Sequence, residues 1–180
     1  MPPRRGCGDS LPKNDCGIAT RFTMSCAEKK DDALIIAEAI RLVSEGVSIT
    51  FPVKGRSMLP FIVGDRDSVI LEKPTEIHKG DVVLAFVESE NREDKHYVIH
   101  RIISLDDDRV TLMGDGNLSL REYCNRSEVY AKISLVVKPN GEKRLLDSFF
   151  WRLLSKVWFA LLPFRRYLLR IYNKVRLICV

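Results

Sequence analysis

The sequence predicts a mainly β domain, preceded by one amphipathic helix and followed by a basic helical tail. Between residues 47 and 137, short runs alternate apolar and polar side chains and are separated by Gly, Asp and Pro, as is typical of strands. Residues 32 to 46 repeat apolar side chains at helical spacing, and residues 145 to 180 combine Trp, Phe and Leu with recurring Lys and Arg. A chain of 180 residues that is 46% hydrophobic is long enough for one ordinary core.

The N-terminal helix is expected from Asp32 to Gly46, with acidic residues at its start and glycine at its end. Five apolar residues are spaced to share one face: Ala33, Ile36, Ala37, Ile40 and Val43. Charged residues interrupt this segment, so it falls far short of the roughly 20 apolar residues that a membrane span requires. Residues 1 to 30 are rich in Pro, Gly and charge and are expected to be disordered. Residues whose pattern predicts secondary structure occur only after Met24, which is therefore a candidate for the true first residue of the protein.

The central segment, residues 31 to 144, is expected to form one domain of about six strands with turns between them. Asp106 to Asp108 form an acidic run that is most simply a hairpin loop. The expected strands are 47–53, 68–71, 81–87, 97–103, 109–113 and 129–137.

Charge and cysteine usage exclude several classes of protein. Residues 138 to 180 hold ten Lys or Arg against two acidic residues, whereas the rest of the chain is mildly acidic. This asymmetry argues against a nucleic-acid-binding face spread over the domain and for an anionic surface met by the tail alone. The five cysteines form no Cys-x-x-Cys pair and no cluster with histidine, so neither a metal site nor a disulfide framework is predicted. No cofactor is predicted, and no cleavable signal follows the N-terminal arginines.

One short segment, Gly55 to Pro60, suggests covalent catalysis. It places the Ser57 hydroxyl beside Met58, whose side chain is flexible and apolar, and near Pro60, which restricts the backbone. A serine hydroxyl is a poor nucleophile at neutral pH, so a base and a group that orients the base are needed elsewhere. Taken alone, Ser57 is better explained as an ordinary turn serine, and it is the neighbouring Met58 and Pro60 that favour a nucleophile.

Two later segments offer the missing groups. His100 shares one strand face with Val98 and Ile102, where a carboxylate partner could tune its basicity, although a lone histidine there is often only a core residue. Asp115 lies between two glycines in a segment that also has the composition of a hairpin turn. Arg101, on the opposite strand face, is expected to be structural, either in an ion pair or as a clamp on a loop, and His96 and His78 are expected to be solvated bystanders.

These residues carry a resemblance to a known family. Ser57-Met58 with Pro60 and the downstream Gly64-Asp65 resembles the nucleophile box of type I signal peptidases and of the self-cleaving LexA-type repressors. Further boxes follow in the same order across residues 48 to 137: Gly80-Asp81, His100-Arg101 and Gly114-Asp115-Gly116-Asn117. The chain is thus similar to S24/S26 serine peptidases, and His100 in place of the more usual lysine favours the Ser-His-Asp branch of signal peptidases.

The resemblance implies a role for each residue. Ser57 would attack the scissile carbonyl, His100 would accept its proton, and Asp115 would orient the imidazole. Glu122 stands where relatives often carry a second aspartate and is a weak substitute for it. Gly55 precedes Arg56 rather than the Ser-Gly of signal peptidases, so backbone amides would have to stabilise the oxyanion. The substrate-binding and oxyanion residues are then Gly55, Met58 and Pro60.

The tail, residues 145 to 180, is expected to form two interfacial helices hinged at Pro163. Their aromatic and leucine faces would enter the acyl boundary and their basic stripe would meet anionic headgroups. A helical hairpin packed on the domain or on a partner protein is the alternative. If the tail lies in the interface, truncation after Asn140 is expected to release a soluble β domain that still cleaves a short diffusible peptide.

Together these features predict a serine endopeptidase that cleaves a signal, leader or precursor peptide. Its expected location is cytoplasmic, peripherally associated with the inner membrane through residues 145 to 180. One alternative is a LexA-type self-cleaving regulator, since the Cys7-Gly8 and Cys16-Gly17 bonds resemble bonds that such proteins cut. The other is a non-catalytic binding module tethered to a membrane.

Overall fold

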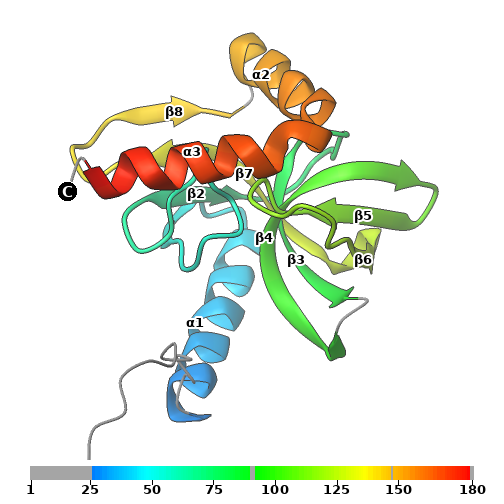
Figure 1. The fold of residues 1–180 in the computed structure, drawn as a ribbon. Helices are drawn as coiled ribbons and strands as arrows, with labels where there is room; N and C mark the ends of the chain where they lie inside the picture. The colour runs from blue at the N-terminus through cyan, green and yellow to red at the C-terminus, as the bar shows by residue number, and fades with distance from the viewer. Residues whose placement is uncertain (1–25, 90–91, 147, 179–180) are drawn as a thin grey trace, which may run out of the picture.

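The protein is described by a computed structural model that covers residues 26–89, 92–146 and 148–178. Eight strands form one antiparallel sheet in the order β1-β2-β7-β3-β4-β5-β6, and β8 pairs with β7 (Figure 1). Because β6 pairs with β3 as well as with β5, strands β3 to β6 close into a small barrel. The strands are β1 (Ile49–Pro52), β2 (Ser68–Glu72), β3 (Val82–Ser89), β4 (Arg92–Asp106), β5 (Arg109–Met113), β6 (Glu122–Asn125), β7 (Val129–Val137) and β8 (Lys143–Leu145).

The prediction of a mainly β chain with helices at both ends is confirmed. All six expected strands form, and Asp107 turns the chain between β4 and β5 with a φ of 31°. Strands β6 and β8 were not predicted, because each has only three or four residues and neither shows a clean alternation. Strand β4 is longer than expected, since its pairing with β3 extends to Arg92.

Helix α1 (Cys26–Ser44) begins earlier than predicted, so residues 26 to 30 are helical rather than disordered. The expected disorder of residues 1 to 25, the start at Met24 and the two Cys-Gly bonds lie outside the described residues. The predicted apolar face is only partly correct. Val43 is buried and Ile36 and Ile40 pack on the core, but Ala33 and Ala37 are exposed and Ala39 is buried instead.

Two hydrophobic clusters hold the sheet together. One lies inside the small barrel and includes Val83, Ile102 and Leu112. The other lies between α1, β2 and β7, and it includes Val43 together with Met58, the residue next to Ser57. The segment that carries Ser57 is therefore anchored in the core by its neighbour.

The C-terminal segment forms two helices joined at Pro163, as predicted, and this pair of helices is called the hairpin below. It consists of α2 (Phe149–Ala160), a 3-10 turn η2 (Leu162–Phe164) that contains Pro163, and α3 (Arg165–Ile178). Figure 1 shows α1 at the lower end of the molecule and α2 at the upper end. None of the described helices combines the length and the apolar content needed to cross a membrane.

Candidate active site

The loop between β1 and β2 carries Ser57 and is closed at its base by hydrogen bonds. The Val53 amide donates to the Asp67 carbonyl (3.2 Å), and the Asp65 amide donates to the Val53 carbonyl (2.7 Å). Gly64 packs so closely on Gly55 that a Cβ atom there would lie 1.9 Å from the Gly55 carbonyl oxygen. This contact gives a physical reason for glycine in the Gly64-Asp65 pair of the sequence motif.

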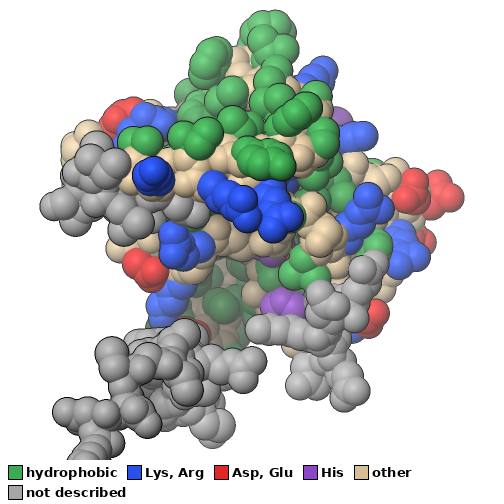
Figure 2. Space-filling view, in the orientation of Figure 1, with side chains coloured by type: hydrophobic (Ala, Val, Ile, Leu, Met, Phe, Trp, Pro, Cys, Tyr) green, Lys and Arg blue, Asp and Glu red, His purple; other side chains and the backbone are tan. Residues whose placement is uncertain are grey.

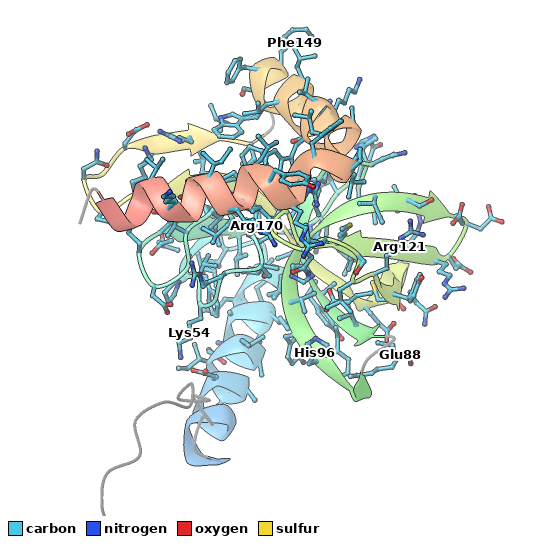
Figure 3. The ribbon with its side chains drawn as sticks, in the orientation of Figure 1. Lys54, Glu88, His96, Arg121, Phe149 and Arg170 are labelled. Carbon is cyan, nitrogen blue, oxygen red and sulfur yellow. The ribbon has the colours of Figure 1, made fainter. Side chains whose placement is uncertain are left out.

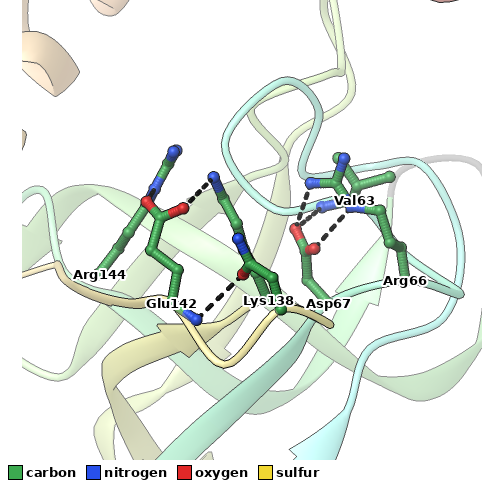
Figure 4. Close-up of polar contacts among 7 residues, drawn as sticks. Val63, Arg66, Asp67, Lys138, Glu142 and Arg144 are labelled. Carbon is green, nitrogen blue, oxygen red and sulfur yellow. Dashed lines mark hydrogen bonds and ion pairs between the residues drawn. The ribbon is translucent and has the colours of Figure 1, made fainter.

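The Asp67 carboxylate fixes the C-terminal end of this loop. It accepts hydrogen bonds from the Val63 amide (2.9 Å) and from Arg66 (2.7 Å), as Figure 4 shows beside the more exposed contacts of Glu142. Burial alone would raise the pKa of Asp67, but these hydrogen bonds outweigh it and hold that pKa below its ordinary value. The loop is therefore fixed at both ends.

Ser57 and His100 line the same cavity. It has a volume of about 300 Å³ and is walled by α1, by the end of β1, by the Ser57 loop and by β4. Of the other predicted binding residues, Gly55 and Met58 also line it, whereas Pro60 does not. The Ser57 hydroxyl makes no hydrogen bond with any described residue, and nucleophile and base are often loosely placed before a substrate binds.

His100 is buried, as its position on the apolar face of β4 predicted. Its Nδ1 atom contacts the Glu122 carboxylate, which is buried on β6. The second ring nitrogen, Nε2, faces the loop after β5: a Cβ atom on Gly114 would lie 3.0 Å from Nε2 and 2.5 Å from the Ser57 carbonyl oxygen. Glycine at 114 thus lets the imidazole and the Ser57 backbone approach the same point.

The predicted partner of His100 is wrong. Asp115 does not contact the imidazole; it accepts hydrogen bonds from Arg101 Nε (2.9 Å) and Nη2 (2.7 Å), and both side chains are almost fully buried. The structural role expected for Arg101 is confirmed as an ion pair, with Asp115 as its partner. Glu122, which the sequence offers only as a weak substitute, occupies the orienting position because β6 pairs with both β3 and β5.

His96 lies closer to this group than predicted. Its Nε2 atom is 3.4 Å from the second Glu122 carboxylate oxygen, and a quarter of its side chain is exposed. The sequence signal was present, because residues 96 and 100 differ by four positions in one strand and therefore share a face. His78 is mostly exposed, as expected.

Among the residues that the structure describes, no group of three or more His, Cys, Asp or Glu side chains is placed to hold a metal ion. The described cysteine Cys124 is buried and unpaired, and burial raises the pKa of its thiol to about 12. This thiol is therefore uncharged, and a weak nucleophile, at neutral pH.

Comparisons with family models, with curated proteins and with solved structures found no match for this chain.

The Arg101–Asp115 pair should be essential for folding. Replacing Asp115 by Asn leaves the buried guanidinium without a counter-charge, and we expect the free energy of unfolding to fall by about 3–5 kcal/mol. Replacing Glu142, whose ion pair with Arg144 is exposed, by Gln should lower the free energy of unfolding far less, because solvent screens this pair. Urea denaturation measures both, and similar losses in the two variants would contradict the structural role of Asp115.

Proposed function

We propose that the protein is a serine hydrolase that cleaves a peptide bond with Ser57 as nucleophile and His100 as general base. One observation carries the proposal: Glu122 contacts Nδ1 of His100, while Nε2 faces the backbone of Ser57 across Gly114. A carboxylate on one ring nitrogen and a serine beside the other are what a nucleophile, base and orienting group require. The order of the sequence boxes supports an S24/S26-type mechanism.

Each step of the proposed reaction assigns one role to one side chain. The Ser57 hydroxyl attacks the carbonyl carbon and its proton passes to His100 Nε2. Glu122 then stabilises the imidazolium through Nδ1, and the imidazolium returns the proton to the leaving amine. Backbone amides of the Ser57 loop stabilise the oxyanion, a contribution typically worth about 3–4 kcal/mol. Water hydrolyses the acyl-enzyme with His100 acting again as base.

A strand edge beside the cavity fits a peptide substrate. Residues 97 to 100 of β4 pair with β3 on one side, whereas the pairing of β4 with β5 begins only at Arg101. Among the described strands, the other edge of this stretch is open, and it leads along the cavity wall to His100. An extended peptide could add to this edge through main-chain hydrogen bonds and place an apolar side chain in the cavity.

Kinetics on a peptide library test the catalytic roles. We expect Ser57→Ala and His100→Ala each to reduce kcat/KM by about 10³-fold or more, because the members of such a group act as a unit. Glu122→Gln should reduce kcat/KM by about 10²–10⁴-fold, since the imidazole loses its orienting charge. His78→Ala, a change at an exposed histidine away from the cavity, should leave the rate within about twofold.

The outcomes of this test also separate the alternative functions. Activity that survives His100→Ala would sink the Ser-His assignment. Cleavage of the chain itself, seen as a loss of mass that Ser57→Ala prevents, would favour the self-cleaving regulator. No cleavage of any peptide or of the chain would favour the non-catalytic module.

We further propose that the hairpin attaches the protein peripherally to an anionic membrane. Its outer surface carries large exposed apolar side chains, and Figure 2 shows them gathered over α2 and along one edge of α3, with basic side chains along the other edge. The combination of an apolar strip and an adjoining basic strip suits the acyl boundary and the anionic headgroups. The exposed apolar residues are Phe149, Phe150, Leu153, Val157, Phe164, Tyr167, Ile171 and Val175.

Sedimentation with vesicles tests this attachment. The protein should pellet with vesicles that contain anionic phospholipid, and salt should weaken binding only in part, because each basic residue supplies roughly 1 kcal/mol that salt screens while apolar burial is unaffected. The double variant Phe149→Ser, Ile171→Ser should bind at least about tenfold more weakly. Leu34→Ser, an equally exposed apolar position on α1, is the matched control. Equal binding by the double variant and the control would rule out docking through the hairpin.

A further inference from the structure

Two side chains of the hairpin bind the backbone of the loop after β5. Trp158 donates a hydrogen bond from its indole nitrogen to the Asp115 carbonyl (2.9 Å). Arg165 donates from Nη1 to the Asn117 carbonyl (2.9 Å). These contacts join residues more than forty positions apart in the sequence, so they arise only when the hairpin is seated on the domain.

The contact between the hairpin and the domain is well packed. Arg165 is completely buried, and its guanidinium lies over the Trp158 ring, 5.2 Å from the ring centre. The Trp158 ring in turn packs edge-on against Phe61, which lies in the Ser57 loop four residues after Ser57. A buried guanidinium is costly unless acceptors and an aromatic face compensate it, so Arg165 fixes the hairpin at this one position.

The same loop meets the candidate catalytic residues on its other side. The Gly116 amide donates a hydrogen bond to the Ser57 carbonyl (2.7 Å), and Gly114 lies between Ser57 and His100 Nε2. Asp115 is held from a third direction by Arg101. Residues 114 to 117 therefore connect the hairpin to the backbone of the nucleophile.

We propose that Trp158 and Arg165 are positioning residues for Ser57, acting through the loop 114–117. Seen this way, the tail is part of the catalytic unit, in contrast to the expectation from sequence that a domain without it still cleaves a short peptide. The catalytic consequence rests on the proposed hydrolase function. The mechanical link from hairpin to loop to Ser57 does not, and it can be measured without any substrate.

The test compares Trp158 with Trp151, a second tryptophan that packs on the same phenylalanine. Trp151 and Trp158 pack edge-on against Phe61 at 5.5 and 5.4 Å between ring centres, but only Trp158 donates to the loop. Trp158→Phe should lower kcat about 10–100-fold with KM nearly unchanged, because a small displacement of a reacting group is costly. Trp151→Phe should change kcat less than about threefold. Arg165→Lys should resemble Trp158→Phe, with Arg166→Lys, at an exposed neighbour, as its control.

Native-state hydrogen exchange gives a second readout that needs no activity. The Gly116 amide should exchange at least about tenfold faster in Trp158→Phe than in the wild type or in Trp151→Phe, because its bond to Ser57 loosens. If the wild type cleaves no peptide, the proposed function fails. The exchange rate of the Gly116 amide then tests by itself whether the hairpin positions Ser57. Equal Gly116 exchange in the two tryptophan variants, or equal kcat where activity exists, would overturn the inference. Should Arg165→Lys not fold, the tryptophan pair still decides.

Discussion

The buried ion pair between Arg101 and Asp115 is the interaction on which the candidate site depends. It ties the loop after β5 to the middle of β4, and Arg101 Nη1 reaches on to the Gly80 carbonyl (2.8 Å). With Asp115 fixed, its carbonyl faces Trp158 and the next amide faces Ser57. Removing one partner of such a pair leaves an uncompensated buried charge. We infer that the intact pair specifies one position of the loop more than it adds to the free energy of folding.

Two adjacent residues of β4 contact different carboxylates. His100 and Arg101 point to opposite faces of the strand, and each meets its own carboxylate, Glu122 on one side and Asp115 on the other. Figure 3 shows Phe149, on α2, at the top of the molecule and Lys54, which lines the candidate cavity, lower down near α1.

Sequence periodicity predicts much of this fold, because alternation and turn residues are local signals. Strand alternation also predicts a structural role for Arg101, which forms an ion pair with Asp115. The resemblance of the sequence boxes names Ser57 and His100 as candidates. It assigns the wrong carboxylate to His100, since the contact with Glu122 depends on how β6 closes the barrel, and a four-residue strand carries little pattern of its own. The contacts of the tail with the loop after β5 were missed for a similar reason. Its amphipathic pattern describes the outer face of the hairpin, whereas the inward contacts of Trp158 and Arg165 are set by tertiary packing.

The central claim is that Ser57 is an activated nucleophile, and covalent labelling by a fluorophosphonate tests it most directly. The hydroxyl displaces fluoride at phosphorus only when a base accepts its proton, so no knowledge of the substrate is needed. Mass spectrometry should find one adduct, on Ser57, that forms at least about 10²-fold more slowly in His100→Ala. An unlabelled Ser57, or labelling at the same rate without His100, would contradict this account of the site.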